Sequence, residues 1–248
     1  MGNLDIPEED GAGLKLGTKS QMDRQVSIGV LVFPRISNYT DFEPFLHEPD
    51  VSLQYVEHPD PAATFDVICF PGTKSTIADL AWLRAKGWDK FIAAHYAAGG
   101  FVVGICGGYQ MMGRRIEDPE YIESDVRSVD GLGLLDLKTV FEKEKITSRV
   151  DGIHVASGLA ISGYEIHCGR ITSLSSNRPF RIRKQGGISP EEFEGAFYAG
   201  ELVHHPCLGH TEVPLGLGAL HSARIIMWVA SAIALVLMLT VRATMFTR

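Results

Sequence analysis

The sequence predicts an α/β fold, an open and mostly parallel sheet sandwiched by helices, to which a further apolar helix is added near the C-terminus. Four short apolar runs alternate with helix-compatible stretches in the first half of the chain. These runs are apolar along nearly their whole length, as strands buried on both faces of a parallel sheet are. The chain of 248 residues, 45% hydrophobic and 21% charged, is also long enough to bury a sizeable core.

Strands and helices are expected in alternation from residue 27 onwards. The apolar runs lie at Ser27–Phe33, Val51–Val56, Asp66–Phe70 and Gly100–Cys106. The helix-compatible stretches are Thr40–His47, Ile77–Lys86, Trp88–Ala98 and Gly107–Arg114. Two further strands are expected at Leu134–Phe141 and Gly163–Arg170, whereas the Ser-, Arg- and Gly-rich residues 173–187 indicate a surface loop. Because such sheets bind ligands outside the carboxyl ends of their strands, the turns after Phe70 and Ile105 are the first candidates for a site.

The two ends of the chain differ from this body. Residues 1–25 indicate a polar linker without the apolar centre of a signal peptide, so secretion is not expected. Residues 26–185 are expected to form the folded domain, and residues 186–224 a poorly defined, divergent segment. The uncharged residues 225–241 predict a transmembrane helix, at the short limit for a bilayer core of about 30 Å, and a buried helix is the alternative.

Charge and cysteine content exclude several classes of function. The net charge of -7 comes without a cluster of basic residues, which argues against nucleic-acid binding. The four cysteines, Cys69, Cys106, Cys168 and Cys207, lie too far apart for a disulfide framework or a zinc-ligand pattern. No metal site is expected, and a reducing compartment, the cytoplasm, is the expected location.

Cys106 carries the strongest chemical signal. In VVGICGGYQMMG, residues 102–113, an apolar strand leads into a glycine-flanked turn and then a helix, the arrangement of a nucleophile elbow. The N–H groups at the start of that helix favour a thiolate and can bind an oxyanion. A lone cysteine is more often a buried core residue, as we expect of Cys69, but glycines at 104, 107 and 108 would pack a core strand poorly. We therefore expect acyl transfer with Cys106 as the nucleophile.

Five stretches of the sequence are similar to one enzyme family. They are PRISNYTDFEPF (34–45), FPGTKSTIADLAWLR (70–84), GICGGYQMMG (104–113), GLGLLDLKTVFEKEK (131–145) and GYEIHCGR (163–170). Together they resemble the glutaminase domain of the cobyric acid synthases, a class I, triad-type glutamine amidotransferase with a flavodoxin-like sheet. The resemblance covers roughly residues 26–170, and its first two strings favour the cobyric acid branch over relatives that share the cysteine turn.

The resemblance implies a reaction and a partner. By this resemblance Cys106 is expected to attack the side-chain amide of glutamine, which would give a γ-glutamyl thioester and release ammonia. In the family this ammonia amidates corrin side-chain carboxylates in cobalamin biosynthesis, on an ATP-dependent synthetase domain that acts on cobyrinic acid diamide. No cofactor is expected in this chain, because it contains no G-x-x-x-x-G-K-[ST] phosphate loop. ATP and Mg²⁺ are expected only on a separate synthetase domain or subunit.

The resemblance also implies roles for residues around Cys106. Backbone N–H groups of Gly107 and of either Gly72 or Thr73 are expected to form the oxyanion hole, since both turns follow strands. Gln110, in the family's Cys-x-Gly-x-Gln pattern, is either a residue that seats glutamine or a polar residue on a helix face.

Glu165 and His167 alternate along a predicted strand and share one face. A structural or substrate-lining role is expected for both of them, rather than direct proton transfer. The general base is less well defined, because the family's Gly-Thr-Tyr-Leu-His-Gly string does not occur in this sequence. His221, which follows a leucine, is the candidate base, and the alternative is a loop histidine beside the apolar segment; His204, His205 and His210 are competing candidates.

Two interpretations of function stay open at this point. In the first, the chain is the glutaminase part of a cobyric acid synthase, works with a separate synthetase, and contacts a membrane through residues 225–241. In the second, it is a non-catalytic remnant or binding module whose C-terminal part was replaced, through a frameshift near Gly186, by an unrelated tail. A cysteine hydrolase for another substrate is disfavoured by the length of the resemblance.

Overall fold

A computed structural model of the chain describes residues 26–37, 39–154, 160–173, 180–184 and 192–194. The chain divides into two compact units, residues 1–112 and 113–248. The predicted linker at 1–25 and the predicted transmembrane helix at 225–241 lie outside the described residues, as does most of the divergent segment 186–224. No helix within the described ranges is both long and apolar enough to cross a bilayer.

The first unit is built on a parallel four-stranded sheet with the strand order β3-β1-β4-β6. Its strands are β1 (Val26–Leu31), β3 (Val51–Val56), β4 (Val67–Phe70) and β6 (Phe101–Gly104). Each coincides with a predicted apolar run, apart from small shifts at the ends. Counted along the chain, the order is 2-1-3-4, the order of a flavodoxin-like sheet. The predicted parallel α/β class is therefore confirmed for this unit.

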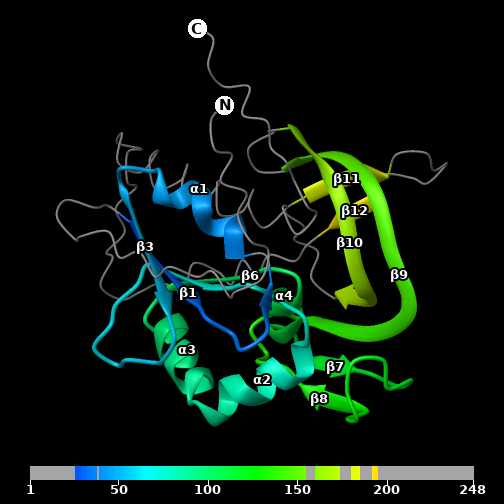
Figure 1. The fold of residues 1–248 in the computed structure, drawn as a ribbon, viewed down its shortest axis with the longest axis horizontal. Helices are drawn as coiled ribbons and strands as arrows, with labels where there is room; N and C mark the ends of the chain where they lie inside the picture. Colours follow the sequence, from blue (N-terminus) through cyan, green and yellow to red (C-terminus); the bar gives the residue numbers. More distant parts are fainter. Residues whose placement is uncertain (1–25, 38, 155–159, 174–179, 185–191, 195–248) are drawn as a thin grey trace, which may run out of the picture. The chain divides into compact units, whose positions relative to one another are not determined.

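Helices cover both faces of this sheet. They are the 3-10 helix η2 (Tyr39–Phe42), α1 (Glu43–Leu46), α2 (Thr76–Ala85), α3 (Trp88–Ala97) and α4 (Gly107–Met111). Figure 1 shows α1 on one side of the sheet and α2 and α3 on the other. The connection from β1 to β3 crosses the sheet in one direction and the connection from β4 to β6 in the other, so right-handed crossovers place their helices on opposite faces.

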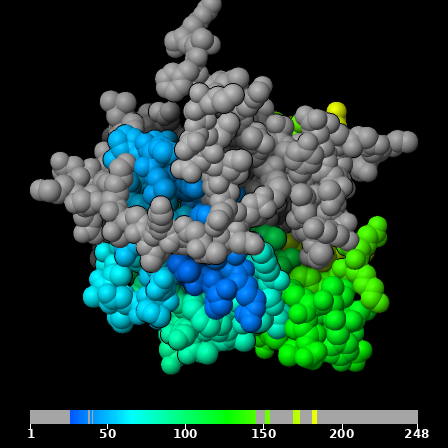
Figure 2. Space-filling view, in the orientation of Figure 1, coloured from blue at the N-terminus to red at the C-terminus, as the bar shows by residue number. Residues whose placement is uncertain are grey.

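Two helix predictions need correction. The helix expected at 40–47 is divided into η2 and α1, and a proline occupies the first turn of α1, where its missing N–H removes no helical hydrogen bond. The helix expected at 107–114 ends at Met111, because Arg115 already belongs to a strand of the second unit. The connection from β3 to β4, shown in cyan in Figure 2, lies at the surface, and Glu57, His58 and Asp60 in it are exposed.

The second unit contains a six-stranded sheet in the order β12-β11-β9-β7-β8, with β10 also paired to β9. Its strands are β7 (Arg115–Glu117), β8 (Ser128–Asp130), β9 (Leu137–His154), β10 (Ala160–Ser173), β11 (Phe180–Lys184) and β12 (Glu192–Glu194). Only the β7–β9 pair among the described strands of this sheet is parallel. The expected mostly parallel sheet is thus confined to the first unit, and this antiparallel sheet was not predicted.

The strands expected at 134–141 and 163–170 are parts of the long β9–β10 pair. Its register shifts between Cys168 and Arg170, where Gly169 adopts a φ of 93° that a bulge of this kind requires. The surface loop expected at 173–187 was wrong, because β11 lies within it. In β11 the buried Ile182 is flanked by exposed arginines, so a composition rich in arginine concealed the two-residue period of a strand.

We expect Asp41, in η2, to make the stability of the first unit depend on pH. Burial raises the pKa of its carboxyl to about 7, against about 3.9 for an unfolded aspartate. The folded protein therefore binds this proton more tightly and loses stability as the pH rises from about 4 to 7. We expect the free energy of unfolding to fall by at most about 1.4 kcal/mol per pH unit in this window, and Asp41→Asn to remove the fall.

Urea unfolding at pH 5 and pH 7 measures this effect. The exposed Glu57→Gln variant, in the connection from β3 to β4, is the control and is expected to keep the pH dependence of the unchanged chain. A pH dependence that survives in Asp41→Asn would show that another group is responsible.

Candidate active site

Cys106 occupies a strained turn between β6 and α4. Its φ of 48° and ψ of -113° lie in a region that residues with a side chain rarely adopt, at a cost of about 1–3 kcal/mol. The thiol is reduced and half-buried. The predicted sequence of strand, sharp turn and helix is therefore present. Cys69, by contrast, is a core residue of β4 as predicted, and burial raises the pKa of its thiol to about 12.

Glycines flank Cys106 because no side chain fits at their positions. A Cβ on Gly108 would lie 2.3 Å from the carbonyl oxygen of Phe70, and a Cβ on Gly107 would lie 2.5 Å from Cγ2 of Thr73. A Cβ on Gly104 would lie 2.7 Å from the backbone of Tyr109 in the following helix. These approaches bring the start of α4 against the carboxyl end of β4.

The turn after β4 lies beside the nucleophile. β4 and β6 are neighbours in the sheet, and the Ile105 N–H donates to the Phe70 carbonyl at 2.8 Å. Pro71 then leads into the two-residue strand β5 (Gly72–Thr73). A Cβ built on Gly72 would lie only 3.8 Å from Cβ of Cys106. The two turns singled out from the sequence therefore meet at the carboxyl end of the sheet.

A short antiparallel ladder fixes the direction of the backbone at β5. The partner strand is β2 (Ile36–Ser37), in which Ile36 lies opposite Thr73. One position further along, the Lys74 N–H donates to the Arg35 carbonyl at 2.9 Å. Hydrogen-bonded and non-hydrogen-bonded pairs alternate in an antiparallel ladder, so the N–H of Thr73 points away from β2.

This direction distinguishes between the two oxyanion donors that the sequence left open. The backbone nitrogen of Thr73 lies 3.4 Å from the point where a Cβ of Gly107 would be. Gly107 begins α4, and the first N–H groups of a helix have no partner within it. The geometry therefore favours Thr73 over Gly72 as the donor that faces the Gly107 N–H. Two backbone donors on neighbouring turns beside a thiol can bind the oxygen of a tetrahedral intermediate.

Gln110 joins α4 to α2. Its side chain is buried, with 4% of its surface exposed, and its Oε1 accepts a hydrogen bond from Oγ1 of Thr76 at 3.3 Å. This contact gives Gln110 a structural role, because it holds α4 against the first turn of α2. Its action on glutamine stays a prediction.

The other predicted site residues lie elsewhere in the chain. Glu165 and His167 belong to β10 of the second unit, opposite Ser148 and Ile146 of β9, and their spacing of two places them on one face of the strand as predicted. The structure describes the backbone of these two residues but not their side chains. His221, His204, His205 and His210 lie outside the described residues. The residues that the structure brings together are Cys106, Gly107, Gln110, Gly72 and Thr73.

Two charged residues beside this site were missed at the level of the sequence. Asp79 of α2 is fully buried, and its Oδ1 accepts from Nη1 of Arg35 at 2.9 Å. Its Oδ2 accepts from Oγ1 of Thr73 at 2.5 Å. A signal was present, because residue 79 lies among Ile77, Leu80 and Leu83, the buried apolar residues of α2, where a carboxylate is rare unless it is paired.

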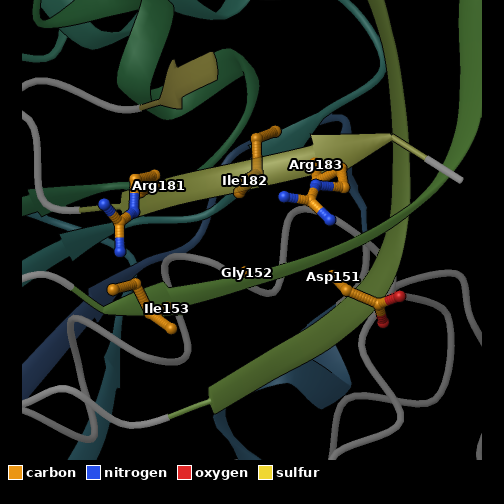
Figure 3. A pocket seen from close by; sticks show the side chains of 6 residues that line it. All are labelled: Asp151, Gly152, Ile153, Arg181, Ile182 and Arg183. Carbon is orange, nitrogen blue, oxygen red and sulfur yellow. The ribbon is translucent and has the colours of Figure 1, made fainter. Parts of the chain in front are cut away.

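The second unit has a hollow of its own, of about 300 Å³. It is lined by Asp151, Gly152 and Ile153 of β9 and Arg181, Ile182 and Arg183 of β11. Figure 3 shows both arginine side chains leaving β11 on the side opposite to Ile182. None of the predicted site residues lines it. Within the described ranges, no group of three or more His, Cys, Asp or Glu residues is placed to hold a metal ion.

Comparison with known proteins gives a family match over most of the chain. Residues 27–210 match the CobB/CobQ-like glutamine amidotransferase domain. The match thus extends well past residue 170, where the resemblance found in the sequence ends.

Curated proteins named cobyric acid synthase are among the similar sequences. The one from Syntrophobacter fumaroxidans is 42% identical over 211 residues, which cover 80% of this chain and 41% of that protein. The one from Brucella suis is 40% identical over 211 residues, covering 81% of this chain and 43% of that protein. The chain therefore spans about two fifths of the length of these relatives. Among solved structures, PurLQS from Thermotoga maritima is 18% identical, with a TM-score of 0.48 over 66% of this chain and 76% of that chain.

Proposed function

The chain belongs to the CobB/CobQ-like glutamine amidotransferase domain family, and from this premise we propose that it is the glutaminase part of a cobyric acid synthase. The observation that carries the proposal is the meeting of Cys106, in a strained turn, with the backbone donors of Thr73 and Gly107. The similarity to cobyric acid synthases supports the choice of branch.

The proposed reaction passes through a thioester. The Cys106 thiolate adds to the side-chain amide carbon of glutamine, and the amide oxygen, now negatively charged, accepts hydrogen bonds from the N–H groups of Thr73 and Gly107. The carbon–nitrogen bond breaks, and the nitrogen leaves as ammonia after taking a proton from the protonated general base. Water then gives a proton to the same base as it adds to the thioester, the thiolate leaves, and glutamate is formed. The donors stabilise the charge in both additions.

The ammonia is consumed elsewhere. We propose that a separate synthetase domain or subunit, which holds ATP and Mg²⁺, uses it to amidate corrin side-chain carboxylates. The named relatives support this division, because the part that matches this chain is 41% to 43% of their length.

Ammonia and glutamate production by the purified chain tests the glutaminase proposal. Glutamine is expected to yield the two products in equal amounts, and an acid quench is expected to trap a γ-glutamyl adduct that mass spectrometry locates on Cys106. Adding the synthetase partner with cobyrinic acid diamide and ATP is expected to divert the ammonia into product. No ammonia above the buffer blank and no adduct, with or without that partner, would support the non-catalytic remnant instead.

The family match also bears on the general base. It ends at residue 210, so it includes His204, His205 and His210 but not His221. This favours one of the three over the residue that the sequence alone ranked first. We expect alanine at the true base to lower kcat by about 10²- to 10⁴-fold, and alanine at His221 to leave kcat within a factor of about two. Steady-state kinetics of the four single variants identifies the base, and a loss at His221 alone would restore the first assignment.

A further inference from the structure

We propose that Arg35 and Asp79 are positioning residues that fix the oxyanion donor of Thr73. The three side chains form what we call the clamp: the Arg35 guanidinium, the Asp79 carboxylate and the Thr73 hydroxyl, joined in that order. This inference rests on the proposed function and adds to it the residues that hold its site in shape. Neither charged residue touches the reacting atoms in this account.

The charge at the centre of the clamp is enclosed. The Asp79 side chain is 0% exposed, whereas that of Arg35 is 50% exposed. A buried carboxylate is unfavourable unless it is paired and hydrogen-bonded, and here each of its oxygens has a different partner. The carboxylate therefore links three segments: the residue before β2, the strand β5 and the first turn of α2.

The hydroxyl of Thr73 is held from two sides. It donates to Oδ2 of Asp79 and accepts a hydrogen bond from the Ser75 N–H at 3.1 Å. The next backbone group is fixed as well, since the Lys74 N–H donates to the Arg35 carbonyl at 2.9 Å. Arg35 thus holds this turn twice, through its carbonyl directly and through its guanidinium by way of Asp79. Rotation of the peptide at Thr73 would have to break these bonds together.

A fixed donor matters more for the rate than for the fold. An oxyanion donor acts because it already points at the position where charge develops, and a displacement of about 1 Å can cost about 10²-fold in rate. The clamp also accounts for charged residues in two of the family strings, Arg35 in PRISNYTDFEPF and Asp79 in FPGTKSTIADLAWLR. The reaction itself leaves both residues without a role.

Three single variants test the clamp: Arg35→Gln, Thr73→Val and Asp79→Asn. We expect each to lower kcat for glutamine hydrolysis about 10- to 100-fold, with KM changed by less than about twofold. Alkylation of Cys106 by iodoacetamide forms no oxyanion, so its rate is expected to stay near that of the unchanged chain. Hydrogen exchange of the backbone N–H groups in residues 70–76 is expected to become about tenfold faster or more.

Asp66→Asn is the matched control. This carboxylate also accepts a backbone N–H and a hydroxyl, at 2.6 and 2.8 Å, but both come from Ser27 of β1 rather than from β5 or α2. It is expected to leave kcat and the exchange of residues 70–76 unchanged. Because Asp79→Asn and Asp66→Asn make the same chemical change, an effect seen only in Asp79→Asn is due to loss of the clamp and not to loss of a carboxylate as such.

The outcomes separate the clamp from the proposed function. The inference would be overturned if the clamp variants had the same kcat and the same hydrogen exchange as the control Asp66→Asn. A rise in KM alone would also overturn it, because it would assign Arg35 to substrate binding. If the unchanged chain releases no ammonia, the proposed function fails, and the exchange of residues 70–76 alone then decides the clamp. A variant that does not fold shows fast exchange throughout the first unit, and the remaining variants then carry the test.

Discussion

Cys106→Ala is expected to reduce glutamine hydrolysis to background, a loss of about 10⁴-fold or more in kcat. The thiol supplies the electron pair that breaks the amide, and the backbone donors of Thr73 and Gly107 cannot replace it. The γ-glutamyl adduct is expected to vanish with the activity. Ammonia release in a coupled assay and the mass of the acid-quenched protein measure the two effects.

Cys69→Ala is the control for this experiment. Cys69 is buried in β4 with 1% of its surface exposed, so alanine there is expected to cost about 1 kcal/mol of stability and to leave the adduct in place. Hydrolysis that persisted in Cys106→Ala but disappeared in Cys69→Ala would move the nucleophile to the neighbouring strand and overturn the assignment.

Gly108→Ala is expected to have the largest effect on stability, about 3 kcal/mol or more. Its Cβ would lie 2.3 Å from the Phe70 carbonyl oxygen, closer than a Cβ can approach backbone, so α4 or the end of β4 has to move. Because Cys106 lies between these two elements, kcat is expected to fall as well. Urea unfolding and steady-state kinetics at the same pH measure both quantities.

Gly87→Ala provides the matched comparison. Gly87 has a φ of 79° and nothing within 4 Å of the added Cβ, so this variant measures the cost of a left-handed backbone alone, about 1–2 kcal/mol. Gly87 lies beyond the C-terminal end of α2, whereas the site lies at the first turn of that helix, so kcat is expected to be unchanged. If Gly108→Ala were no more destabilising than Gly87→Ala, the approach of α4 to β4 would be looser than the structure indicates.

The sequence predicted the first unit better than the second for a physical reason. The central strands β1 and β4 are buried along nearly their whole length and are mostly apolar, and such runs are visible without knowledge of their neighbours. The described strands of the second unit pair mostly antiparallel, and in β11 the exposed positions carry the charges of Arg181 and Arg183. Their pairing partners lie far away in the sequence, so neither the strand nor its register could be inferred locally.

The candidate site shows the same division. The sharp turn at Cys106 was predictable because its glycines are adjacent to it in the sequence. The choice of Thr73 over Gly72 depends on the phase of the β2–β5 ladder, which only the folded chain defines. The pairing of Arg35 with Asp79 spans 44 positions and leaves no trace in either segment alone beyond a charged residue among apolar ones.

That pairing also has an evolutionary consequence. A change at Asp79 alone leaves a guanidinium at the edge of the core without its counter-ion, and a change at Arg35 alone leaves a carboxylate enclosed with one partner fewer. We therefore expect selection to act on the two positions together, so that a tolerated change at one is accompanied by a compensating change at the other. Although they lie in separate strings of the sequence, the two residues are expected to be inherited as a single unit.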